Sequence, residues 1–215
     1  RSLDDLSARI DTLSALLLGR PYLVGSLIGG PDRAEVLVTR VDGFDCVTYL
    51  ETVLALALAH TPGDFERELT LLRYDRGRIS WLDRNHYTSD WFDRGVARGA
   101  LRWVLPERYT SVSRRLSVLA GYPVRERRVH WLAVEAASAL EDAARTGDAV
   151  GFGSSREDLD TFHVGLLVQR PDGLAVRHAS RSSGEVVEVL LAEFIADNTP
   201  PGLLVARPLP PGDTP

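Results

Sequence analysis

The sequence contains very little sulfur and no lysine. Among its 215 residues there is one cysteine and no methionine, and all 25 basic residues are arginine. A single cysteine cannot close an intramolecular disulfide, so no cross-link holds the fold and the redox compartment stays open. The exclusive use of arginine is typical of a GC-rich genome, and no function follows from it.

Charge and hydropathy argue against two further classes of protein. The formal net charge is -5, which provides no broad cationic surface for nucleic acid. No apolar run approaches the roughly 20 residues that a membrane-spanning helix needs. No secretory signal is visible either. Because the chain contains no methionine, we expect Arg1 to be a processed or trimmed end rather than a translation start.

Signatures of metal and cofactor chemistry are also missing. His60, His86 and His130 occur without a His-Glu-x-x-His motif or a cysteine pair, so no metal site is expected. Gly29-Gly30 and Gly151-Phe152-Gly153 are too sparse for a phosphate-binding loop. No Gly-x-Ser-x-Gly elbow is present for a serine nucleophile. We expect no cofactor.

The distribution of apolar residues predicts one α+β domain. With 44% hydrophobic residues, the chain can bury a sizeable core. Ser2 is predicted to cap a first helix, which Gly19 ends. Residues 73–128 are rich in arginine and aromatics without a clean period, and the Pro/Gly-rich tail from Pro208 is expected to fray. Further helices are predicted at 65–72 and 135–145 and around Phe194, and strands at 36–38, 162–168, 175–179, 186–189 and 203–206, the last four in a small antiparallel sheet.

The single cysteine, Cys46, lies at the predicted start of a helix. Apolar residues recur after it at three- and four-residue steps, and Pro62 is expected to close the run. Free backbone N–H groups in a first helical turn lower the pKa of a thiol and supply donors for an oxyanion. The alternative is a buried cysteine that acts only as a small hydrophobic residue.

Two histidines provide the partners that a nucleophilic cysteine needs. His163 lies in an apolar, strand-like segment, and His178 follows the turn signal Pro171-Asp172-Gly173. A hairpin in the right register brings both imidazoles to one face. One imidazole then takes and returns the thiol proton while the other fixes its tautomer. Two unrelated core or surface histidines are the alternative.

Five short motifs occur in the order found in a known family. They are Leu18-Gly19-Arg20-Pro21-Tyr22-Leu23-Val24-Gly25, Phe44-Asp45-Cys46, Gly147-Asp148-Ala149-Val150, His163-Val164-Gly165 and His178-Ala179-Ser180. Together they resemble the NlpC/P60 cysteine peptidases, which are papain-like hydrolases of bacterial peptidoglycan.

The chain departs from the common pattern of that family at the nucleophile. The usual Asp-Cys-Ser-Gly is here Asp45-Cys46-Val47-Thr48, and a long insertion follows with Leu72-Arg73-Tyr74-Asp75-Arg76-Gly77 and Arg84-Asn85-His86-Tyr87-Thr88-Ser89-Asp90-Trp91. This combination is similar to the DUF1460 branch, whose activity is that of an N-acetylmuramoyl-L-alanine amidase. The resemblance spans residues 12 to 207.

The resemblance implies a papain-like α+β fold in which an antiparallel sheet packs against the helix that carries the nucleophile. It implies Cys46 as nucleophile, His163 as general base and acid, and His178 as the orienting residue. The substrate would be peptidoglycan or a muropeptide, cut between N-acetylmuramic acid and L-alanine. Two alternatives stay open: a γ-D-glutamyl-diamino acid endopeptidase, and a non-catalytic cell-wall-binding module, against which the presence of all three residues argues.

The resemblance also implies which residues contact the substrate and how the chain is divided into domains. Tyr22 and Asp45 would lie beside the thiol, while Arg73 and His86 of the insertion would contact substrate. The alternatives are a packing role for Tyr22, a helix-capping role for Asp45 and a structural ion pair for Arg73. We expect one catalytic domain at 1–207 with an insertion subdomain at 73–128 and a tail at 208–215. We also expect a monomer located in the cell envelope, periplasmic or secreted.

Overall fold

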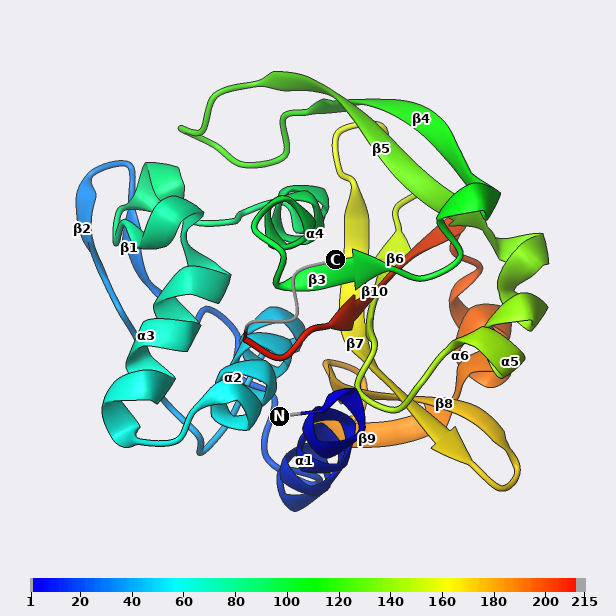
Figure 1. The fold of residues 1–215 in the computed structure, drawn as a ribbon. Helices are drawn as coiled ribbons and strands as arrows, with labels where there is room; N and C mark the ends of the chain where they lie inside the picture. Colours follow the sequence, from blue (N-terminus) through cyan, green and yellow to red (C-terminus); the bar gives the residue numbers. More distant parts are fainter. Residues whose placement is uncertain (1, 212–215) are drawn as a thin grey trace.

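A long antiparallel sheet forms the centre of the molecule (Figure 1). The computed structural model describes residues 2–211. The order of the strands is β4-β5-β10-β6-β7-β8-β9, and β3 pairs with the other end of β10. Their bounds are β3 (Leu101–Trp103), β4 (Tyr109–Leu116), β5 (Arg125–Ala133), β6 (Ala149–Gly153), β7 (Thr161–Arg170), β8 (Gly173–Ser180), β9 (Glu185–Leu190) and β10 (Gly202–Pro208). A separate hairpin pairs β1 (Ile28–Gly30) with β2 (Arg33–Val36).

Helices cover both faces of this sheet. Figure 1 shows α1 to α4 gathered toward one side and α5 and α6 on the other. The α-helices are α1 (Leu3–Leu16), α2 (Cys46–Leu58), α3 (Pro62–Arg73), α4 (Thr88–Ala97), α5 (Leu140–Ala143) and α6 (Leu191–Asn198), and the 3₁₀ helices are η1 (Asp75–Gly77), η2 (Trp81–Asp83), η3 (Pro106–Arg108) and η4 (Val134–Ala139).

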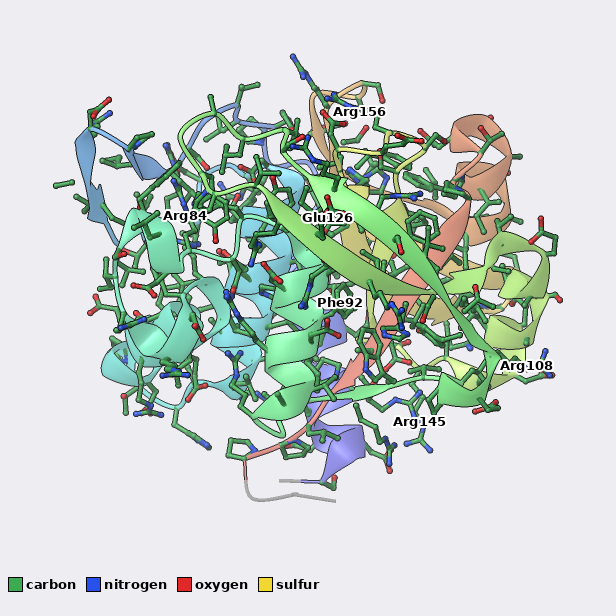
Figure 2. The ribbon with its side chains drawn as sticks, turned by 90° about the horizontal axis from the view of Figure 1, so that it is seen from above. Arg84, Phe92, Arg108, Glu126, Arg145 and Arg156 are labelled. Atoms are coloured by element: carbon green, nitrogen blue, oxygen red, sulfur yellow. The ribbon has the colours of Figure 1, made fainter. Side chains whose placement is uncertain are left out.

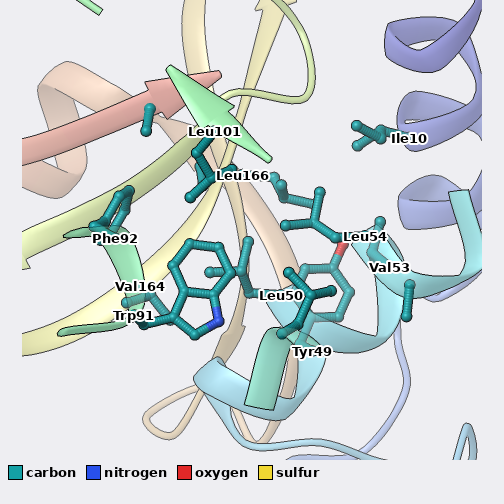
Figure 3. Packing of buried hydrophobic residues seen from close by; sticks show 14 of the residues in the cluster. Ile10, Tyr49, Leu50, Val53, Leu54, Trp91, Phe92, Leu101, Val164 and Leu166 are labelled. Carbon is teal, nitrogen blue, oxygen red and sulfur yellow. The ribbon is translucent and has the colours of Figure 1, made fainter. Parts of the chain in front are cut away.

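The two-residue period of the strands divides the core into two layers. On β7, Val164 and Leu166 pack with α2 and α4, whereas Leu167 faces the layer under α5 and α6. Successive side chains of a strand point to opposite faces, so an apolar strand of this kind contributes to both layers. Figure 3 shows the first layer, in which Leu50 and Trp91 meet the strand residues.

The sequence predicted the starts of the first two helices correctly. Ser2 caps α1, and its Oγ accepts from the Asp5 N–H at 3.2 Å. Helix α2 begins at Cys46, where Asp45 and Thr48 form a capping box. Each member of the box satisfies a backbone N–H of the other, which fixes the residue at which the helix starts.

Several predicted boundaries were wrong. Pro62 does not close the cysteine helix: α2 ends at Leu58, and Pro62 is the first residue of α3, where its missing N–H costs nothing. The early strand lies at Arg33–Val36 rather than 36–38. The helix predicted at 135–145 is η4 followed by the short α5.

The C-terminal end is more ordered than predicted for a tail from Pro208. Strand β10 includes Pro208, and Leu209 is buried and donates its N–H to the Ala100 carbonyl at 2.9 Å. Residues 212–215 of the predicted tail lie outside the described residues.

The segment 73–128 contributes directly to the main sheet. It supplies β3, β4 and the start of β5, which pair with each other or with β10. Figure 2 shows Glu126 on the β4–β5 hairpin and Arg84 beside the β1–β2 hairpin. The insertion is therefore joined to the sheet by strand pairing as well as by helix packing.

Candidate active site

The thiol of Cys46 lies in the first turn of α2. The first N–H groups of a helix have no partner within the helix. Here the backbone groups of Cys46 and Val47, together with that of Val164 on β7, hydrogen-bond the sulfur. These bonds lower the pKa of the thiol, but burial and the Asp45 carboxylate outweigh them and raise it to about 12. Burial thus favours the neutral thiol.

The two predicted imidazoles lie in hydrogen-bond contact. Strands β7 and β8 pair in the register Leu166↔Arg177, which brings His163 and His178 to the same face. The His163 Nε2 and His178 Nδ1 atoms are 2.7 Å apart, and the rings stand at 89° to each other. One of these nitrogens donates and the other accepts, so each imidazole sets the tautomer of the other.

Burial keeps both imidazoles neutral. It lowers the pKa of His163 to about 3, with a contribution from His178, and the pKa of His178 to about 4. Phe194 of α6 provides part of this burial: its ring stacks on His163 at 5.5 Å and meets His178 edge-on at 5.1 Å. Each ring is therefore unprotonated at neutral pH and retains a nitrogen lone pair.

Tyr22 is held next to the thiol by backbone hydrogen bonds on two sides. Its N–H donates to the Gly184 carbonyl at 2.7 Å, and the adjacent Leu23 N–H donates to the Phe44 carbonyl at 2.8 Å. The pKa of the Tyr22 hydroxyl is raised by burial and by the nearby Cys46 and Asp45. The Tyr22 phenol therefore lies close enough to Cys46 for the two groups to interact electrostatically.

These groups open onto one cavity, which we call the histidine cleft. It has a volume of about 650 Å³. Cys46, His163, His178 and Tyr22 line it together with the β8–β9 turn, two valines of β9 and one side of α6. The thiol and both imidazoles thus face a single solvent-accessible space.

Arg73 and His86 lie elsewhere, in a second cavity that we call the insertion recess. It has a volume of about 450 Å³ and is lined by Asp45, Val47 and residues of the β1–β2 hairpin and the insertion. Asp45 and Cys46 are consecutive, so the start of α2 separates the two cavities. The Asp45 Oδ1 accepts the Thr48 N–H at 2.8 Å, which is the predicted capping alternative.

The side chain of Arg73 is buried in an ion pair. Its Nε donates to Glu51 Oε2 at 2.7 Å and its Nη1 to the Val38 carbonyl at 2.7 Å, and both side chains of the pair are only 2% exposed. The Nε2–H of His86 donates to the Trp81 carbonyl at 2.7 Å, and burial lowers the pKa of His86 to about 4. The geometry favours a scaffold role for Arg73.

A family model for N-acetylmuramoyl-L-alanine amidase-like proteins, AmiA-like, matches residues 12–203. The chain belongs to this family. Among solved structures, an N-acetylmuramoyl-L-alanine amidase from Bacteroides uniformis is 26% identical with a TM-score of 0.82, and the match covers 94% of this chain and 98% of that one. No curated protein sequence matches the chain.

Two other solved structures share the fold. Protein LPG0564 from Legionella pneumophila, which carries the DUF1460 family model, is 24% identical with a TM-score of 0.79, over 95% of this chain and 89% of that one. A putative xylanase from Bacteroides fragilis is 26% identical with a TM-score of 0.77, over 91% and 99%. These two likenesses are of fold, and membership of the amidase-like family rests on the family model.

Two residues of the histidine cleft escaped the sequence analysis of this AmiA-like protein. Phe194 was predicted only to lie on a short helix, and Arg181 was not singled out. Arg181 directly follows the strand that carries His178. This closeness in sequence to a candidate catalytic residue was the signal that could have identified Arg181. Nothing in the local pattern around Phe194 predicts its contact with the imidazoles, because that contact depends on how α6 folds back over β8.

Residues 2–211 contain neither a membrane-spanning helix nor a metal-binding cluster. No helix there is both long enough and apolar enough to cross a bilayer. No group of three or more histidine, cysteine or acidic side chains within the same range is arranged to hold a metal ion.

Proposed function

We propose that this AmiA-like protein is a papain-like cysteine hydrolase of the NlpC/P60 type, which cleaves the amide between N-acetylmuramic acid and L-alanine of peptidoglycan. The observation that carries the proposal is the convergence of Cys46, His163 and His178 on the histidine cleft, with the imidazoles 2.7 Å apart. Family membership supports the amidase-like activity.

In the proposed first half-reaction, Cys46 Sγ attacks the lactyl carbonyl carbon and His163 takes the thiol proton. The His163 imidazolium is then stabilised by its bond to His178. Negative charge develops on the carbonyl oxygen, and the first-turn N–H groups of α2 and the Tyr22 hydroxyl, which lie near the thiol, are the donors proposed to stabilise it. The C–N bond breaks as His163 returns the proton to the alanyl nitrogen, leaving a thioester on Cys46.

In the second half-reaction, His163 removes a proton from water and the hydroxide attacks the thioester. Collapse of the second tetrahedral intermediate releases the lactyl carboxylic acid, and His163 returns the proton to the sulfur. Both groups start and finish neutral, which agrees with the direction in which burial moves their pKa values.

Mass spectrometry of muropeptides after digestion tests the choice of bond. The amidase releases an intact stem peptide that begins with L-alanine, whereas an endopeptidase leaves L-Ala-D-Glu attached to the sugar and releases a peptide that begins with the diamino acid. Cys46→Ala and His163→Ala should abolish both products, because the first lacks the nucleophile and the second the base. His130→Ala is the matched control, since this exposed histidine lies on the outer face of β5. An active Cys46→Ala protein refutes the mechanism, and a product in which L-Ala-D-Glu is still attached to N-acetylmuramic acid refutes the bond.

A further inference from the structure

The two cavities on either side of Asp45-Cys46 differ in the charge that they offer to a ligand. In the insertion recess the formal charges of the lining side chains cancel, because Asp45 and Glu51 are balanced by Arg73 and Arg84. Glu51 and Arg73 already form a buried ion pair. An ionic ligand would therefore gain little there, since each charge has its counter-charge close by.

The insertion recess does offer hydrogen-bonding groups whose charges are already balanced. Arg84, which lines the recess, pairs with Glu35 at 3.5 Å. The Nε of Arg84 and the Oε2 of Glu35 are nevertheless buried without a hydrogen-bond partner among residues 2–211. A buried donor without a partner is costly unless a ligand or water satisfies it. The recess also has Asn85, His86 and an aromatic wall at Trp81, whose ring contacts His86 and Tyr122.

The histidine cleft has the opposite character. Arg181 on the β8–β9 turn, and Glu193 and Asp197 on α6, are exposed and line it. Within the described part of the chain, none of the three has an ion-pair or hydrogen-bond partner, whereas most other charged groups near the site are paired. Unpaired charges of both signs suit a ligand that itself carries both carboxylate and amino groups.

We infer that the insertion recess is a binding site for the uncharged N-acetylated sugar of the substrate, and that the peptide stem occupies the histidine cleft. The muramyl unit is uncharged in the substrate because its lactyl group is amidated, and it presents hydroxyl and acetamide groups to planar polar side chains. This orientation places the alanyl nitrogen on the side of His163, which has to protonate it. The inference rests on the proposed function for the identity of the two ligand halves.

The test blocks the insertion recess without touching the catalytic groups. Ala120 is exposed and lines the recess, so Ala120→Trp fills it. Val118→Trp is the matched control, because Val118 lies on the same β4–β5 connection, is 40% exposed and lines neither cavity. Both are made in the Cys46→Ala protein, and binding is measured by calorimetry.

Two probes report separately on binding of the sugar half and the peptide half of the substrate. The first is the N-methylamide of N-acetylmuramic acid, and the second is the tripeptide L-Ala-γ-D-Glu-diaminopimelate. Ala120→Trp should weaken binding of the sugar amide by about tenfold or more, equivalent to about 1.4 kcal/mol, and leave the tripeptide unaffected. Val118→Trp should bind both probes as the parent does.

Three results overturn the inference: Ala120→Trp weakens the tripeptide instead of the sugar amide, it changes neither, or the parent binds no sugar amide. If Ala120→Trp fails to fold, Gly30→Leu replaces it, because a Cβ at this recess-lining position meets only the Arg33 Cβ, at 3.9 Å. The proteins used here cannot turn over substrate. Failure of the cysteine mechanism therefore shows in the muropeptide digestion, and failure of the sugar site shows in these binding isotherms.

Discussion

Replacing Arg73 by alanine should destabilise the fold strongly and change substrate affinity little. The substitution leaves the Glu51 carboxylate, 2% exposed, without the guanidinium that lies 2.7 Å from it. It also removes the donor to the Val38 carbonyl. Breaking a buried ion pair by removing one partner costs about 3–5 kcal/mol. For a chain of this size about 1 kcal/mol shifts the melting temperature by about 2–4 °C, so we expect a decrease of about 6–20 °C.

Urea unfolding followed by circular dichroism measures this loss, and the KM for muropeptides is determined on the same proteins. Arg67→Ala is the matched control on α3. Its ion-pair partners are at the surface and its side chain is 59% exposed, so its loss should lower the stability far less than the loss of Arg73. The double variant Arg73→Met/Glu51→Leu should recover most of the stability, because apolar replacement removes both buried charges.

The reasoning fails if Arg73→Ala loses less than about 1 kcal/mol while its KM rises. That result would return Arg73 to the substrate-contacting role predicted from the sequence. Unchanged KM with a large loss of stability would assign it to the scaffold.

Three further predictions concern the imidazole pair and the ring of Phe194 that packs on it. Because burial holds the pKa of His163 below its ordinary 6.5, the acid limb of a kcat/KM–pH profile should lie below pH 6.5, and a midpoint at or above that value would contradict the geometry. The same shift makes the unfolded chain bind more protons than the native state as the pH falls from 6.5, so urea stability should decline over that window and decline less in His178→Asn. Phe194→Leu should lower kcat and raise the acid-limb pKa with little change in KM, because the ring that stacks on His163 is lost. Phe162→Leu serves as the comparison, because that ring is 39% exposed and lies 6.4 Å from His163. Equal effects of the two substitutions would refute a positioning role for Phe194.

Sequence patterns were sufficient where local chemistry determines the structure. The start of α2 follows from the capping chemistry of Asp45 and Thr48, which acts over three residues. The pairing of His163 with His178 follows from one hairpin, whose turn and strand pattern are visible in the chain. The positions of the candidate nucleophile and base were accessible for the same reason.

Patterns failed where arginine occupies inward positions. On the β4–β5 hairpin, Arg114 packs over the ring of Trp131 and Arg127 pairs with Asp93 of α4, at 2.6 Å. Long arginine side chains bury their aliphatic portion while the head group finds a partner. Because arginine counts as polar in a hydrophobicity pattern, the inward-facing positions of these strands do not stand out. The sequence of this segment therefore shows no regular period.

Long-range partners were the other limit. Glu51 and Arg73 are 22 positions apart on different helices, so the ion pair could be named as an alternative but its partner could not be identified. The same holds for the contact of Phe194 with the imidazoles, which requires the three-dimensional path of α6.

The N-terminus of α4 has a consequence for the order in which the chain acquires structure. Tyr87, at the N-cap position, makes no side-chain cap. The Ser89 N–H is instead satisfied by Asp160, 71 positions later, whose other oxygen accepts the Thr161 N–H at the start of β7. During synthesis on the ribosome, α4 therefore lacks this cap until residue 160 has emerged, close to the moment when His163 becomes available. Maturation of the insertion and assembly of the imidazole pair are thus tied to the same late stretch of translation.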